Sequence, residues 1–210
     1  RRLTDCVQHI ADFIERGQAR LLDHKHLADP TDPRNHYLHP ESQEERVAAI
    51  RNGNLKRYVI ALETDAGVRA VKFFTPLGTA NRVWYALRSS PSQSAHELYP
   101  QALEKGILFP RSYGFLDLRD DRSLVRSAQV MEFLDSLQSL GSYVTQGFRN
   151  AGSDDSARNE LIRWLARHLA RLHQMDFYHP DLKPYHAFVL PDPKRGERLL
   201  FIDMDRARFS

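Results

Sequence analysis

Two acidic residues bracket a pair of short apolar segments near the C-terminal end of the sequence, and this feature constrains the fold most. Asp181 precedes the apolar run 187–190, and Asp203 follows the run 199–202. Proline and charged residues separate the runs, which predicts two buried strands joined by a tight hairpin. Such a hairpin can aim both carboxylates at one point. Phosphoryl transfer uses a pair of this kind, because one carboxylate orients the attacking hydroxyl and the other holds a metal ion on the nucleotide phosphates.

The motif around these acids resembles the catalytic segment of the protein-kinase-like superfamily, H-x-D-x-x-x-x-N followed by D-F-G. The matching residues are His179, Asp181, His186 and Asp203. The resemblance implies that Asp181 is the catalytic base and that Asp203 binds the metal ion. It also implies that Lys183, two residues after the base, neutralises the transferred phosphate.

The departures from this motif favour one branch of the superfamily. Pro180 stands where protein kinases carry arginine, and His186 replaces asparagine. The pattern H-x-D-x-x-x-x-H followed by I-D-x-x-R-A resembles the bacterial lipopolysaccharide-core kinases, which phosphorylate heptose or Kdo. A looser version of the pattern is similar to aminoglycoside and choline phosphotransferases, but His186 and Arg206-Ala207 favour the lipopolysaccharide-core branch. The resemblance implies an α+β, protein-kinase-like bilobal fold, with ATP and Mg²⁺ as cofactors and a sugar or glycolipid as acceptor.

His186 admits two interpretations. It lies at the second metal site, or it hydrogen-bonds the catalytic loop and fixes Asp181. Neutral imidazole is a poor ligand for Mg²⁺, which prefers oxygen, and this favours the second interpretation. Asp205 likewise either adds a carboxylate to the metal site or pairs with a neighbouring arginine.

Segments upstream resemble the parts of a kinase N-lobe in the expected order. Lys72 is central in the alternating segment 68–74, which resembles the third strand, whose lysine contacts the nucleotide phosphates. Glu97 begins a helical stretch and is the candidate helix-C glutamate that pairs with Lys72. Glu132 and Leu134 fall at the last strand and the hinge that binds adenine. No G-x-G-x-x-G motif occurs, and R-N-G-N at 51–54 is the only candidate turn for covering the phosphates.

Periodicity and turn residues divide the chain into three predicted parts. They are an N-terminal helical extension and loop (1–43), an antiparallel-sheet N-lobe with helix C (44–134) and a helical C-lobe (135–210). The predicted elements include a helix over 4–22, strands over 46–51, 55–63 and 68–75, a loop at 89–92 and a helix over 157–175. Because the chain begins at Arg1 and ends at Ser210, we expect a fragment of a longer protein or a family with an abbreviated C-lobe.

Composition limits the class of protein further. The mean hydropathy of −0.54 and the lack of a long apolar run predict a soluble protein, and the single cysteine suits a reducing cytoplasm. The glycolipid acceptor that the resemblance implies would require peripheral contact with the inner membrane leaflet. A single cysteine excludes an internal disulfide. The net charge of +3 is mild, and no aromatic and basic interleaving argues for nucleic acid. The sequence specifies no oligomeric state. A nucleotide-binding pseudokinase scaffold, a protein Ser/Thr kinase and another small-molecule kinase are the alternatives.

Overall fold

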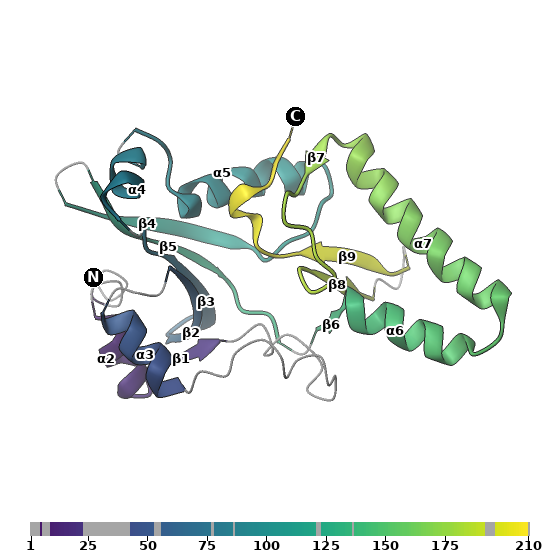
Figure 1. Ribbon diagram of the computed structural model, residues 1–210, viewed down its shortest axis with the longest axis horizontal. Coiled ribbons are helices and arrows are strands. Elements are labelled where there is room, and N and C mark those ends of the chain that lie inside the picture. The colour runs from purple at the N-terminus through teal and green to yellow at the C-terminus, as the bar shows by residue number, and fades with distance from the viewer. Residues whose placement is uncertain are drawn as a thin grey trace. The chain divides into compact units, whose positions relative to one another are not determined.

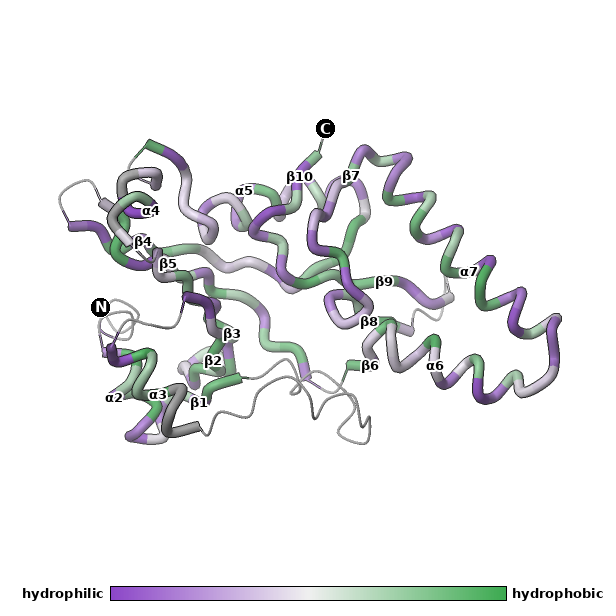
Figure 2. The backbone as a smooth tube through the Cα atoms, in the orientation of Figure 1, coloured by the Kyte–Doolittle hydropathy of each residue, from purple (hydrophilic) through white to green (hydrophobic). Residues whose placement is uncertain are grey.

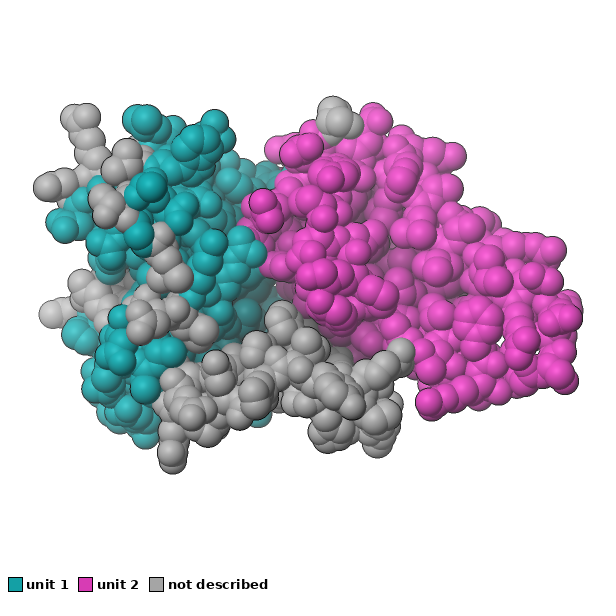
Figure 3. Space-filling model, in the orientation of Figure 1, with its two compact units in different colours: residues 1–23, 36–99, 111–134 teal, residues 24–35, 100–110, 135–210 magenta. Residues whose placement is uncertain are grey.

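The computed structural model contains helices and antiparallel strands (Figure 1), which confirms the predicted α+β class. The residues that it describes are 5, 9–22, 43–52, 56–76, 78–85, 87–120, 123–135, 137–191 and 196–209. The chain divides into two compact units (Figure 3). Unit 1 comprises residues 1–23, 36–99 and 111–134, and unit 2 comprises residues 24–35, 100–110 and 135–210. Among the described residues, no helix is long and apolar enough to cross a membrane.

Unit 1 is built on a five-stranded antiparallel sheet in the order β1-β2-β3-β5-β4. Its strands are β1 (Ala19–Leu22), β2 (Arg57–Thr64), β3 (Gly67–Phe74), β4 (Ser112–Asp120) and β5 (Ser123–Glu132). The predicted strands at 55–63 and 68–75 are confirmed as β2 and β3. The turn between them is closed by Thr64, whose hydroxyl donates to the carbonyl oxygen of Gly67 at 2.6 Å. This sheet carries Lys72 on β3.

Two short helices, α2 (Ile10–Glu15) and α3 (Gln43–Arg51), pack against this sheet. Buried apolar residues from both helices and from the sheet form one shared core. Its members include Ile10, Phe13, Ile14, Val47, Ile50, Tyr58, Ile60, Val71 and Phe73. Burial of this kind contributes roughly 1.5–3 kcal/mol for each large side chain.

Two of the predicted elements in this region are wrong. The helix predicted over 4–22 ends early, because Gly17 adopts a left-handed φ of 69° and Ala19–Leu22 pairs with β2 as a strand. The strand predicted over 46–51 is the helix α3. Val47 and Ile50 are buried three residues apart, which is the spacing of one helical face. The loop of the predicted N-terminal extension corresponds to residues 23–42, which lie outside the described residues.

Helices α4 (Thr79–Trp84) and α5 (Pro91–Glu104) connect β3 to β4. The loop predicted at 89–92 is wrong, because α5 begins at Pro91. Ser90 is fully buried, and its hydroxyl accepts from the amide of Gln93 at 3.0 Å. A serine cap followed by proline in the first helical position is a strong helix start.

Unit 2 contains two long helices, α6 (Leu140–Ala151) and α7 (Asp155–Gln174), and two small sheets. The predicted helix over 157–175 is confirmed as α7, and Asp154 caps it by accepting from the amides of Ser156 and Ala157. Gly147 on α6 lies against Leu161 on α7, where an added Cβ would fall 2.7 Å from a methyl group of that leucine. The absence of a side chain at Gly147 therefore sets how closely the two helices approach.

The small sheets of unit 2 carry the segment with the two acids. A three-stranded sheet has the order β6-β8-β9, formed by β6 (Gln138–Ser139), β8 (Ala187–Leu190) and β9 (Arg198–Phe201). This confirms the predicted hairpin. Strand β7 (Phe177–Tyr178) pairs with β10 (Arg208–Phe209), and the short 3-10 helix η3 (Met204–Arg206) precedes β10. The amide of Phe201 donates to the carbonyl oxygen of Leu108 at 2.8 Å, so the segment after α5 supports the hairpin from outside.

Candidate active site

Two ladders place the acid-bearing segments of unit 2 beside each other. The chain leaves β7 and reaches Asp181 before entering β8, and it leaves β9 and reaches Asp203 before entering β10. Because β7 pairs with β10 and β8 pairs with β9, the two connecting segments are fixed at both ends. The amide of Ile202 also donates to the carbonyl oxygen of His186 at 2.9 Å, which extends the hairpin toward the acids.

The loop that carries Asp181 is held by His186. Nδ1 of His186 lies 2.6 Å from the backbone carbonyl oxygen of Asp181. A carbonyl can only accept, so Nδ1 carries the proton of this hydrogen bond. The histidine is 3% exposed, and its amide donates to the carbonyl oxygen of Lys183 at 2.8 Å. This contact is the one that the second interpretation of His186 expects, and the role of His186 stays a prediction.

The segment that carries Asp203 is held by backbone conformation and by His179. Asp203 has φ 63° and ψ 49°, the left-handed region that residues other than glycine rarely adopt. Such a conformation costs about 1–3 kcal/mol and persists where the surroundings enforce it. Nε2 of His179 lies 3.0 Å from the carbonyl oxygen of Ile202, the residue just before Asp203. A buried ring on one segment therefore fixes the backbone of the other.

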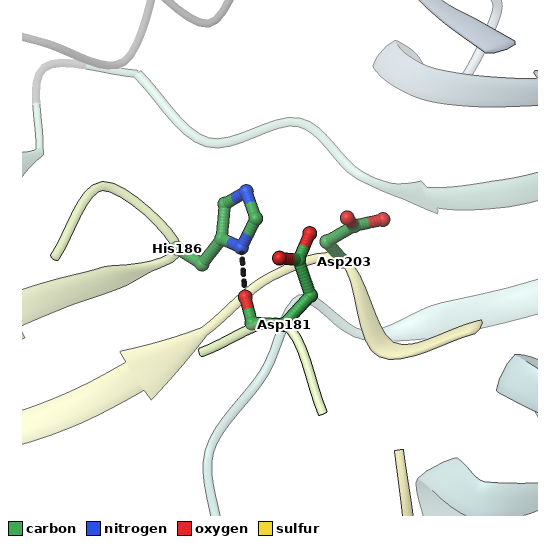
Figure 4. A group of neighbouring side chains, drawn as sticks. All are labelled: Asp181, His186 and Asp203. Atoms are coloured by element: carbon green, nitrogen blue, oxygen red, sulfur yellow. Dashed lines mark hydrogen bonds between the residues drawn. The ribbon is translucent and has the colours of Figure 1, made fainter. Parts of the chain in front are cut away.

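The side chains of Asp181, His186 and Asp203 lie near one another (Figure 4). One potential ligand atom from each lies within 4.8 Å of the others. His186 is buried, whereas both aspartates are half-buried. Two carboxylates suit a hard divalent cation such as Mg²⁺, which takes oxygen ligands, and they fit that ion better than the imidazole does. Asp205, in η3, is half-buried, and its role stays a prediction.

Lys183 binds the carboxylate of Asp181. Its Nζ lies 2.8 Å from Oδ1 of Asp181, and both side chains are close to half exposed. The hydrogen bond from Lys183 holds the pKa of the Asp181 carboxyl below its usual value, and the same bond raises the pKa of Lys183. Asp181 is therefore ionised and Lys183 is cationic over the neutral pH range.

Two contacts in this loop had no clear signal in the sequence. The ring of Tyr185 lies edge-on to His186, with centroids 4.6 Å apart, and Nζ of Lys183 lies 5.6 Å from the same ring. The carbonyl oxygen of Pro184 accepts from the amide of Gly141 at 3.2 Å, which ties the loop to the start of α6. For the contact of Tyr185 with His186, the only signal in the sequence is an aromatic residue placed between a lysine and a histidine.

In unit 1, Lys72 lies on the strand β3 and Glu97 lies on the helix α5. Lys72 is half-buried on β3, between Val71 and Phe73, which are fully buried. Glu97 lies on α5, where its carboxylate accepts from the side-chain amide of Gln93 at 2.8 Å. The pairing of Lys72 with Glu97 stays a prediction.

Buried polar contacts fix α5 against the sheet of unit 1. Nδ1 of His96 lies 2.9 Å from the hydroxyl of Ser112, which also accepts from the side-chain amide of Gln129 at 3.1 Å. The hydroxyls of Ser92 and Ser127 lie 2.8 Å apart. His96 directly precedes Glu97, so these contacts set the position of Glu97 relative to β4 and β5.

The predicted hinge residues lie at the end of β5. The amide of Glu132 donates to the carbonyl oxygen of Arg111 at 2.8 Å, and its carboxylate accepts from the amide of Arg111 at 3.1 Å. The amide and the carboxylate of Glu132 therefore both hydrogen-bond the backbone of Arg111 at the end of the sheet. Leu134 follows the strand and is half-buried.

Comparisons with known proteins relate the chain to one family model and to solved structures. A family model described as "Lipopolysaccharide kinase (Kdo/WaaP) family" matches residues 87–210, which is more than half of the chain and includes both acids. Among solved structures, WaaP in complex with acyl carrier protein is 22% identical, with a TM-score of 0.48 over 74% of this chain and 59% of that one. The chain thus spans less than two thirds of the length of that protein. No curated protein matches.

Proposed function

The chain belongs to the lipopolysaccharide kinase (Kdo/WaaP) family, and from that premise we propose that it transfers the γ-phosphate of ATP to a sugar hydroxyl of a lipopolysaccharide-core glycolipid. Membership confirms the family resemblance predicted from the sequence. The observation that carries the proposal is the convergence of Asp181 and Asp203 within one 4.8 Å group. Phosphoryl transfer uses one carboxylate that orients the attacking hydroxyl and another that binds the metal ion.

In this proposal, the two acids have different tasks. Asp181 accepts the hydrogen bond of the acceptor hydroxyl and then its proton. The lowered pKa of Asp181 makes it a weak base, which a loose transition state tolerates because positioning supplies more of the acceleration than basicity does. Lys183 already lies beside Asp181, so a small rotation of its side chain can bring its charge to the transferred phosphate.

Asp203 is the residue that would hold a divalent cation, with Asp181 beside it. The left-handed conformation fixes the backbone that carries this carboxylate, which lowers part of the ordering cost of binding a cation. Mg²⁺ at that position supplies positive charge to the phosphates of ATP. Nε2 of His186 is the remaining candidate ligand, although its Nδ1 contact with the loop supports a positioning role.

The nucleotide contacts from unit 1 are part of the proposal. Lys72 contacts the α and β phosphates, and Glu97 orients it. The amide of Glu132 is used within the sheet, so hydrogen bonds to adenine come from residues after it, Leu134 among them.

The test is phosphate transfer by the purified chain from radiolabelled ATP to lipid A-core that lacks core phosphate, with casein as a protein acceptor. Label in the glycolipid alone is the expected result. Label in casein alone would identify a protein kinase. A thermal shift with ATP and Mg²⁺ but no transfer to any acceptor would identify the pseudokinase scaffold, which the missing glycine-rich motif favours. A glycolipid acceptor also requires peripheral contact with the membrane that contains it.

A further inference from the structure

The connection between α4 and α5 exposes two large apolar side chains next to each other. Leu87 is 87% exposed and Trp84 is 53% exposed, and these are the highest values among the large apolar residues that the structure describes. The amide of Leu87 donates to the carbonyl oxygen of Trp84 at 3.4 Å, so the two lie on one turn. Single exposed apolar residues are common, but an adjacent pair with the two highest exposures needs an explanation.

Cationic residues surround this pair. The guanidinium of Arg88 lies 3.9 Å from the centroid of the Trp84 ring, and Arg82 is exposed two residues before it. The stretch 66–96 contains four lysine or arginine residues and no aspartate or glutamate. Arg119 donates to the carbonyl oxygen of Tyr85, and its charge is offset by Asp117 at 2.9 Å. The exposed turn is therefore apolar and positively charged.

The turn is held by anchors on both sides of the exposed residues. Tyr85 packs edge-on against Phe74 of β3, with ring centroids 5.3 Å apart. Ser90 is fully buried and caps α5. Trp84, Leu87 and Arg88 therefore project from a turn that the sheet and α5 fix. Figure 2 shows hydrophobic and hydrophilic stretches following each other along this connection.

We propose that Trp84, Leu87 and Arg88 form a docking surface for an anionic phospholipid bilayer. Tryptophan prefers the membrane–water interface, a leucine can enter the acyl region, and an arginine pairs with headgroup phosphates. A stable protein partner usually buries more than about 1,000 Å² of surface, which three side chains do not supply, whereas a weak bilayer contact needs only a few residues. The inference rests on the proposed function, because the glycolipid acceptor proposed above is embedded in a membrane.

The two tryptophans of the chain provide a direct test. In the variant Trp164→Phe, the remaining emission comes from Trp84, and phenylalanine keeps an aromatic ring beside Tyr143 and His168. Vesicles of phosphatidylcholine mixed with phosphatidylglycerol should shift this emission to the blue, and vesicles of phosphatidylcholine alone should not. An unchanged spectrum overturns the proposal. A shift that follows protein concentration without vesicles also overturns it, because the surface is then a contact between copies of the chain.

Charge and apolar contributions are separated by variants in the natural background. We expect Leu87→Ser and Arg88→Glu each to weaken sedimentation with the anionic vesicles by at least about fivefold, since one arginine near such a surface contributes about 1 kcal/mol. The matched controls are Ile162→Ser and Arg163→Glu on α7, an adjacent exposed pair of the same types. Equal losses from both pairs would overturn the assignment to the α4–α5 turn.

Phosphate transfer separates this inference from the kinase proposal. Leu87→Ser should act like the wild type on soluble, deacylated core oligosaccharide and should lose activity on lipid A-core embedded in the anionic vesicles. Loss on both acceptors would overturn the docking role. If the wild type phosphorylates neither acceptor, the kinase proposal fails, while the emission shift and the sedimentation still decide whether the turn binds a bilayer.

Discussion

The two acids of the candidate site are held in opposite ways. The side chain of Asp181 is 42% exposed and its carboxylate is paired with Lys183, while its backbone is tied through His186. Asp203 has a left-handed backbone, and the carbonyl just before it is fixed by the buried His179. The difference indicates one acid whose side chain can move with a substrate and one whose position is set before anything binds.

The largest effects are expected when each of the two carboxylates is removed in turn. We expect Asp203→Asn to abolish both phosphate transfer and the rise in melting temperature that ATP and Mg²⁺ cause. Asp181→Asn should reduce transfer about 10²–10⁴-fold, the usual contribution of a general base, and leave that rise almost intact. Thermal shift and initial rates measure the two effects. Wild-type turnover in both variants would contradict the assignment of the acids.

Removing the ring of His179 tests whether the position of Asp203 is fixed in advance. His179→Ala leaves the carbonyl oxygen of Ile202 without its donor and opens a cavity, so it should lower the free energy of unfolding by about 1–3 kcal/mol. Metal-dependent nucleotide binding should weaken as well. Urea denaturation and thermal shift measure both, and His173→Ala, at an exposed position on α7, is the control. Reduced stability with unchanged metal affinity would limit His179 to a structural role.

The ion pair of Lys183 with Asp181 predicts a dependence on pH. Lys183 lowers the pKa of Asp181, so Lys183→Met should let that pKa rise toward its usual value. Asp181 then protonates at a higher pH, and the acidic limb of the profile of kcat/KM should move to higher pH, in addition to a fall in rate. Lys56→Met, at an exposed position, should leave the limb in place. An unmoved limb in Lys183→Met would assign it to another group.

The smallest effect is expected when His186 is replaced by asparagine. The side-chain amide can still donate to the carbonyl oxygen of Asp181, so His186→Asn should change the free energy of unfolding by less than about 1 kcal/mol. His186→Leu should cost about 1–3 kcal/mol, because that carbonyl loses its donor. The asparagine variant also offers an oxygen ligand, so its activity should favour Mg²⁺ over Zn²⁺ more than the wild type does. Equal stability losses in both variants would show that the hydrogen bond contributes little.

Sequence reasoning succeeded where local patterns and long-range contacts agree. The sequence itself shows the helical period of α7 and the turn residues of the β8–β9 hairpin, and the two acids bracket that hairpin. The first element of the sheet shows the opposite case. Ala19–Leu22 continues the apolar pattern of α2, and its pairing with β2, distant in sequence, decides that it is a strand. Local periodicity does not show that Ala19–Leu22 has β2 as its pairing partner.

The site shows the same limit in its details. Residue types and spacing predicted that Asp181 and Asp203 lie close together, as the structure has them, and ligand chemistry favoured a loop contact for His186. The left-handed backbone of Asp203 and the contact of Tyr185 with His186 depend on how the chain turns after the strands, which residue types alone do not specify. Ser90 before Pro91 was a readable helix start, and the serine-rich composition around it obscured the signal.

The pairing of β7 with β10 has a consequence for how the site is made. It closes a short loop of chain, Phe177–Phe209, that contains both acids and both histidines. Closing a short loop costs little entropy, and contacts between sequence neighbours form quickly. The two ladders that bring the acids together thus lie within one continuous segment of the chain, and Leu108 and Gly141 hold that segment from outside it.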